Sequence, residues 1–200
     1  MSQLSKDDFF NLERRLIEGG YDSDLDSFAV IKERLRNKIP FSADEFARNA
    51  VYVVLAGGFS QKTAKRVHGE IMRVLNGQLT IDNGQLLKIF NNKNKTSAIV
   101  KIWENRNKFR DGYYKLSDLE SKLTYLATLP HIGKITANHL ARNLGENVFK
   151  RDVWIEKLLS RYGGDLLERL EKETALPRGY IDVVLWKACQ IGMIKVTSDK

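Results

Sequence analysis

The sequence predicts an all-α fold. Apolar residues recur at helical spacing along most of the chain, whereas the strict alternation typical of strands is weak. Proline breaks the interior of helices and strands, and the 200 residues contain only three prolines: Pro40, Pro130 and Pro177. We therefore expect helices joined by short turns.

Local signals place these helices in order along the chain. Ser42 followed by Glu45 fits a capping box, and glycine pairs such as Gly19–Gly20 and Gly57–Gly58 mark helix ends. The segment 91–95 is polar and basic, and we expect a loop there. Before a central hairpin, the predicted helices are 7–18, 27–38, 42–55, 60–75, 80–90, 97–107 and 117–128. After it they are 153–162 and 178–191.

We expect one unit over 1–200, built from two helical lobes that share a cleft. Lobe A covers about 42–140, with its hairpin at 121–143. Lobe B combines 1–41 with 145–200. A length of 200 residues suits one large domain or two small lobes.

Composition restricts the class of protein. A hydrophobic fraction of 42% can form a core, and 33 basic against 25 acidic residues give a net charge of +8 and a pI near 9.5. This surplus favours a polyanionic partner, most often nucleic acid. The single cysteine, Cys189, excludes an internal disulfide, a cysteine-based zinc site and an iron–sulfur cluster. The polar start and the lack of a long apolar run predict an intracellular protein away from membranes.

The most informative segment is 126–140. Pro130 ends one helix, Gly133 permits close backbone approach, and a new helix follows at once. The first amides of a helix lack partners and lie at the positive end of its dipole, so a phosphate can bind there, with Lys134 adding charge. A plain turn between two helices is the alternative. The predicted DNA contacts of this hairpin are His131, Gly133, Lys134 and Thr136.

A second motif lies at 149–155. Asp152 precedes an apolar helix, where it suits the N-cap position. Its neighbours Lys150 and Arg151 are cations that either bind backbone phosphate or are solvated surface charges.

These two motifs resemble the helix-hairpin-helix DNA glycosylases, the superfamily of endonuclease III and of the adenine-mismatch, alkylated-base and oxoguanine glycosylases. Leu129 to Gly133 is similar to the Leu-Pro-Gly-x-Gly hairpin of that family. Asp152 stands where the family has its catalytic aspartate, nearly twenty residues later. The resemblance implies base-excision repair on double-stranded DNA: a damaged base flips out of the stack and Asp152 stabilises the oxocarbenium ion and orients water. It also implies that Arg151 contacts DNA and that the two helical lobes form a DNA-binding cleft.

Two positions depart from the family pattern. His131 replaces the first hairpin glycine, which leaves less room for backbone approach. Ile135 stands where lyase members carry a lysine, and isoleucine cannot form a Schiff base. The resemblance therefore implies a monofunctional enzyme without lyase activity. The alternatives are a glycosylase/lyase that uses Lys134, and a DNA-binding module that has lost catalysis.

The base pocket is less well marked. The candidates for contact with the flipped base are Phe59, Trp154, Trp186 and Asp182. For Asp182 three roles are open: it reads a base edge, caps a helix or faces solvent. The resemblance implies no cofactor, no metal and no iron–sulfur cluster. The missing cluster, and Val54 at the position of the adenine-mismatch glutamate, favour an alkylated or oxidised purine. We expect a monomer in the cytoplasm or at the nucleoid.

Overall fold

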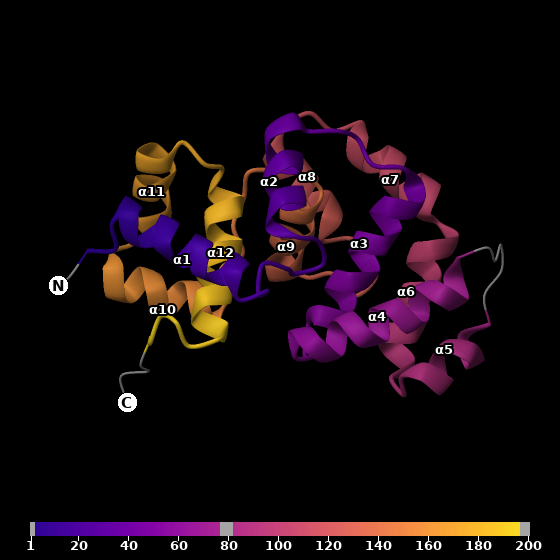
Figure 1. Cartoon of the computed structure of the whole chain (residues 1–200). Coiled ribbons are helices and arrows are strands. Elements are labelled where there is room, and N and C mark those ends of the chain that lie inside the picture. The colour runs from indigo at the N-terminus through magenta and orange to yellow at the C-terminus, as the bar shows by residue number, and fades with distance from the viewer. Residues whose placement is uncertain (1–2, 77–81, 197–200) are drawn as a thin grey trace. The chain divides into compact units, whose positions relative to one another are not determined.

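A computed structural model describes residues 3–76 and 82–196, which form twelve α-helices and no strand (Figure 1). The contacts between residues divide the chain into two units. Unit 1 comprises Met1–Lys38 and Gly145–Lys200, and unit 2 comprises Ile39–Leu144. The all-α prediction is confirmed. The assignment of two functional lobes around DNA stays a prediction.

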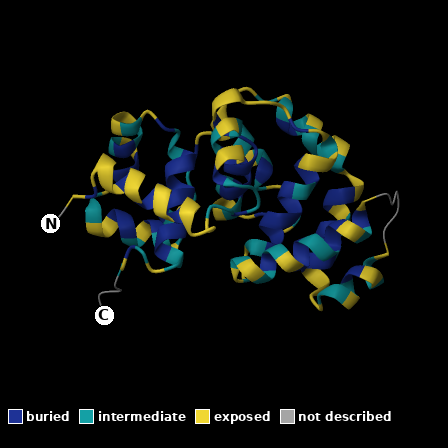
Figure 2. Cartoon of the chain, viewed as in Figure 1, coloured by how far each residue is buried: buried dark blue, intermediate teal, exposed yellow. Residues whose placement is uncertain are grey.

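Unit 2 is built around one helix, α3 (Ala43–Ala56), which is dark blue along most of its length in Figure 2. The predicted capping box begins it, because Ser42 accepts from the Glu45 amide while the Glu45 carboxylate accepts from the Ser42 amide. Helices α4, α6, α7 and α9 pack against α3. The other helices of unit 2 are α4 (Gln61–Leu75), α5 (Asn83–Ile89), α6 (Lys93–Glu104), α7 (Arg106–Tyr114), α8 (Leu119–Leu126) and α9 (Lys134–Asn143).

Unit 1 is organised around α12 (Arg178–Gln190), most of whose residues are buried. Four helices pack on it: α1 (Lys6–Glu18), α2 (Phe28–Asn37), α10 (Val153–Tyr162) and α11 (Leu166–Thr174). Tyr180 of α12 lies edge-on to Phe28 and donates a hydrogen bond to Glu13. Burial and this bond to a carboxylate raise the pKa of Tyr180 above its ordinary value. Helices from both ends of the sequence therefore share one core.

Three parts of the helix prediction were wrong. The predicted loop at 91–95 contains the start of α6, because Asn92 caps that helix by accepting from the Lys95 amide at 3.1 Å. The predicted helix 97–107 is two helices, α6 and α7, which meet at Asn105. The prediction contained only the first two residues of α7 and omitted α11. Part of the predicted helix 80–90 lies outside the described residues, and the rest is α5.

Within the described residues, no helix has both the length and the apolar character required to cross a membrane.

Candidate functional site

The predicted hairpin connects α8 to α9 in unit 2. Leu129 and Ile132 are buried and fix the turn to the core of the unit, and the Ile132 amide donates to the Leu129 carbonyl at 3.0 Å. Between them, His131 is exposed and has a φ of 63°. This left-handed conformation suits glycine and costs other residues on the order of 1 kcal/mol. The backbone at residue 131 thus favours glycine, the residue that His131 replaces in the resemblance.

The start of α9 presents unpaired amides. Its N-cap is Gly133, which has no side chain to cap the helix, and the Gly133 amide itself donates to Thr136 Oγ1 at 2.8 Å. Among the described residues, no acceptor bonds to the amides of Lys134, Ile135 or Thr136. The first turn has no acidic residue, and Lys134 is exposed. These amides, the helix dipole and the lysine together favour an anion.

The Gly57–Gly58 turn lies beside this hairpin. A Cβ built on Gly57 would be 3.9 Å from Thr136 Cγ2, so the two segments are in contact. The Lys95 ammonium donates to the Gly57 carbonyl and lies 5.2 Å from the centre of the Phe59 ring. Burial lowers the pKa of Lys95. Phe59, a predicted pocket residue, packs edge-on against Phe90 and carries this cation on its face.

In unit 1, Asp152 is the N-cap of α10, as the sequence predicted. Its Oδ1 accepts from the amides of Trp154 at 3.0 Å and Ile155 at 3.2 Å. Its Oδ2 lies 3.2 Å from the Nζ of Lys150, in an ion pair whose aspartate side chain is 14% exposed. One carboxylate oxygen therefore fixes the side chain to the helix, while the other carries an ammonium partner.

Two buried side chains of α12 lie behind Asp152. Asp182 is 1% exposed, and its Oδ2 accepts from the Lys150 amide at 3.1 Å. Of the three alternatives for Asp182, the one in which it faces solvent is therefore wrong, because its carboxylate is buried and binds the main chain at Lys150. Cys189 is also buried, and burial together with the negative charge of Asp152 raises the pKa of its thiol to about 12.

The remaining predicted residues of unit 1 lie nearer the surface. Trp154 and Trp186 are half-buried, and each carries a lysine ammonium over its ring, at 5.4 Å from Lys157 and 5.3 Å from Lys187. Arg151 is exposed and pairs with Glu156 at 3.5 Å.

The histidines of α4 and α9 are packing residues. His68 and His139 are both buried, and both lie edge-on to the ring of Tyr52. In the part of the chain that the structure describes, no three His, Cys, Asp or Glu side chains are grouped to hold a metal ion.

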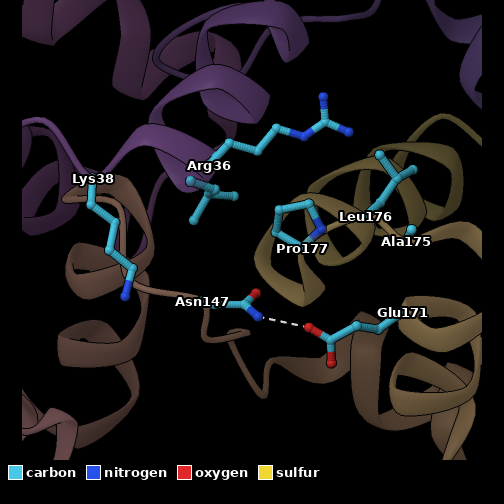
Figure 3. A pocket seen from close by; sticks show the side chains of 8 residues that line it. Arg36, Lys38, Asn147, Glu171, Ala175, Leu176 and Pro177 are labelled. Carbon is cyan, nitrogen blue, oxygen red and sulfur yellow. Dashed lines mark hydrogen bonds between the residues drawn. The ribbon is translucent and has the colours of Figure 1, made fainter.

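Unit 1 also contains an open pocket of about 420 Å³ (Figure 3). Its lining comes from the end of α2, the 147 region and the turn between α11 and α12, and the Asn147 amide donates to Glu171 at 2.7 Å. None of the predicted site residues lines it. The lining residues are Leu35, Arg36, Lys38, Asn147, Glu171, Ala175, Leu176 and Pro177.

The structure thus groups the predicted residues by unit. Unit 2 brings His131, Gly133, Lys134 and Thr136 into one hairpin, and adds Lys95 beside them. Unit 1 joins Asp152 to Lys150. The sequence reasoning gave no role to Lys95. It treated Lys150 only as a phosphate contact or surface charge, although its position two residues before Asp152 was a usable signal.

Comparisons with known proteins found similarity only among solved structures, because no protein-family model and no curated protein matches the chain. The 8-oxoguanine DNA glycosylase of Methanocaldococcus jannaschii aligns at a TM-score of 0.69 with 18% identity, over 96% of this chain and 95% of that one. The Thermotoga maritima 8-oxoguanine DNA glycosylase aligns at 0.62 with 18% identity, over 96% and 98%.

A third structure contains DNA. It is the M. jannaschii 8-oxoguanine glycosylase/lyase in complex with a 15mer that contains 8-oxoguanine. It aligns at a TM-score of 0.64 with 19% identity, over 85% of this chain and 92% of that one. The predicted all-α fold is confirmed, and it is similar to the fold of these 8-oxoguanine DNA glycosylases.

Proposed function

We propose that this chain is a monofunctional DNA N-glycosylase, which releases a flipped, oxidised purine from double-stranded DNA by hydrolysis. The observation that carries the proposal is the geometry of Asp152. Its carboxylate is fixed by two helix amides through Oδ1, and among the described residues its Oδ2 has only the Lys150 side chain as a partner, at a half-buried position. A carboxylate held in this way is preorganised to stabilise a positive charge that develops beside it in the transition state.

Hydrolysis of an N-glycosidic bond creates such a charge. As the bond to the base lengthens, C1′ of the deoxyribose becomes positive. Asp152 Oδ2 stabilises this oxocarbenium ion and accepts a proton from the attacking water. A carboxylate at this point is worth roughly 10²- to 10⁴-fold in rate by the usual magnitudes of such catalysis.

The hairpin supplies the DNA contact of the proposal. Free amides at the start of α9, the exposed Lys134 and the exposed His131 suit a backbone phosphate, and Thr136 holds the Gly133 amide in place. Arg151 is exposed and adds a cation in unit 1. Trp154, Trp186 and Phe59 remain the aromatic candidates for contact with the flipped base.

Ile135 supports the monofunctional form of the reaction. It follows Lys134 in the first turn of α9 and is 57% exposed, so an apolar side chain occupies the position at which lyase members have an amine. A second candidate, a glycosylase/lyase that uses Lys134, is favoured by one structural neighbour described as a glycosylase/lyase. Lys134 is one residue away, and neighbouring helical side chains differ in direction by about 100°.

The lesion is proposed from the structural neighbours. The expected substrates were alkylated and oxidised purines, and all three similar structures are of 8-oxoguanine glycosylases. We therefore place 8-oxoguanine first among the lesions to test.

The experiment is a base-release assay on duplex oligonucleotides that each carry one lesion, with and without hot alkali, for wild type and Asp152→Asn. Asparagine is also a good N-cap and can accept from the same two amides, so the variant removes charge while keeping the helix start. We expect strand cleavage only after alkali, reduced about 10³-fold or more in the variant. DNA binding, measured by fluorescence anisotropy, stays within about threefold of wild type.

Each other outcome identifies a different protein. Cleavage without alkali, trapped by borohydride and lost in Lys134→Arg, establishes the lyase. DNA binding without release of any lesion identifies a non-catalytic module and refutes the proposal.

A further inference from the structure

Lys150 is the closest charged partner of the proposed catalytic carboxylate. Its Nζ lies 3.2 Å from Asp152 Oδ2, and the two side chains are 22% and 14% exposed. Both groups belong to unit 1, and only Arg151 separates them in the sequence. The Asp152 oxygen that faces away from the helix cap is thus the one in contact with an ammonium.

The main chain at Lys150 is fixed by a buried residue of the core. The buried carboxylate of Asp182, on the central helix α12, accepts from the Lys150 amide at 3.1 Å and fixes the main chain there. Within the part of the chain that the structure describes, the amide of the neighbouring Arg151 has no such bond, and the Arg151 side chain is 65% exposed. Buried hydrogen bonds of this kind restrict the positions that the following side chain can reach. Lys150 is therefore held beside Asp152, unlike an ordinary surface cation.

Cleavage of a glycosidic bond requires two charges to be stabilised. When C1′ becomes positive, a base that carried no charge leaves with the bonding electrons and becomes negative. A carboxylate stabilises the positive charge on the sugar, and an ammonium stabilises the negative charge on the base. A preorganised pair of opposite charges stabilises both without reorganisation. Lys150 and Asp152 form such a pair.

We propose that Lys150 is a second catalytic residue of this site: its ammonium contacts the departing base and protonates it, and this makes the site selective for lesions without a positive charge. The inference rests on the proposed glycosylase function and adds a residue and a charge preference to it.

The protons of this reaction balance through the ion pair. The bond between C1′ and the base nitrogen breaks, and its electron pair stays on the base. Lys150 Nζ gives a proton to the base, which leaves neutral. Water adds to C1′ and gives a proton to Asp152, which returns it to the Lys150 amine across the 3.2 Å contact. The sum is water plus nucleotide residue to free base plus abasic sugar, with both side chains restored.

The same charge works against an alkylated base. A 7-methylated guanine is already positive and leaves as a neutral molecule, so it needs neither a proton nor a neighbouring cation. An ammonium at the site repels that base as it binds. The pair thus distinguishes the two lesion classes that the sequence left open, by charge.

The test measures single-turnover base release from two duplexes, one with 8-oxoguanine and one with 7-methylguanine. The variants are Lys150→Met, which keeps length and removes charge, and Lys150→Arg, which keeps charge but gives up a proton poorly. Lys172→Met, an exposed lysine of α11 in the same unit, is the matched control. Thermal unfolding of each variant establishes that it folds, and the Asp182 bond uses the main chain, which all variants retain.

We expect Lys150→Met to lower 8-oxoguanine release about 100-fold or more and to leave 7-methylguanine release unchanged or faster, with Lys150→Arg intermediate for 8-oxoguanine. An equal loss on both lesions overturns the proposal, because Lys150 would then only orient Asp152. The proposal is also overturned if Lys150→Met loses activity on neither lesion. It is overturned as well if borohydride traps an adduct that disappears in Lys150→Arg, because Lys150 would then be a nucleophile. If wild type releases neither base nor any other lesion, the proposed function itself fails, which is a separate result.

Discussion

The starts of helices α9 and α10 both have free backbone amides, but the two helices treat these amides in opposite ways. At α10 the side chain of Asp152 accepts two of the free amides. At α9 the N-cap is Gly133, and the amides of residues 134–136 have no acceptor among the described residues. A helix that caps itself has a negative group at its positive end, whereas an uncapped one keeps that end available for an anion from outside. The difference separates the carboxylate that we propose to be catalytic from the helix start that we propose to bind phosphate.

The strongest way to break this comparison is to make α9 start as α10 does. The backbone at Gly133 has a φ of −101° and a ψ of −179°, which any residue adopts, and a Cβ there has no contact closer than 4.0 Å. We expect Gly133→Asp to cap the helix and raise the free energy of unfolding by roughly 0.3 kcal/mol. DNA affinity should fall about 100-fold, because a carboxylate would then face the phosphate.

Urea unfolding and fluorescence anisotropy measure the two effects. Gly133→Ala is the control: it adds bulk without charge, and we expect a loss of affinity of about tenfold with no gain from capping. If Gly133→Asp leaves DNA affinity unchanged, the start of α9 is not a phosphate site.

A smaller effect is expected from Lys134. Its exposed ammonium adds charge at the start of α9 without any bond to the core. Lys134→Met should weaken binding about threefold to tenfold for every DNA sequence, and should reduce the slope of log affinity against log salt by about one. Lys101→Met, an exposed lysine in the last turn of α6, serves as the control. A slope that stays the same would remove Lys134 from the phosphate contacts.

The smallest effect concerns the turn before α9. His131 has a left-handed backbone, with a φ of 63°. His131→Gly should raise the free energy of unfolding by about 0.5 kcal/mol, because relief of strain exceeds the entropy that glycine adds to the unfolded chain. His131→Ala keeps the strain and should show no gain in urea unfolding. A stabilised alanine variant would place the cause in the imidazole instead of the backbone.

The sequence predicted these two helix starts better than it predicted the rest of the fold. Asp152 and the range 153–162 of α10 follow from a local signal, an N-cap residue before an apolar helix. The helix α7 was missed because Arg106–Tyr114 is mostly polar and buries only Tyr113, so its apolar periodicity is weak. Such a helix is held by its neighbours, which a local pattern does not contain.

Burial of charged groups was the other gap. Asp182 lies within an apolar run, Ile181 to Leu185, and that context signalled the core position that the structure gives it. Lys95 had no comparable signal in its own segment, because its ammonium is held by a carbonyl in the distant Gly57–Gly58 turn. Contacts between segments far apart in sequence determine how these charged groups are buried. The local sequence around a residue does not show which distant segment it contacts.

The discontinuity of unit 1 has a consequence for how the chain is made. Helices α1 and α2 are synthesised before their partner α12. All of Ile39–Leu144 emerges in between and already contains every helix of unit 2. Domains commonly fold as units during synthesis, so the hairpin should form early. The apolar faces of α1 and α2, which include Phe9 and Phe28, would stay uncovered until α12 has been synthesised.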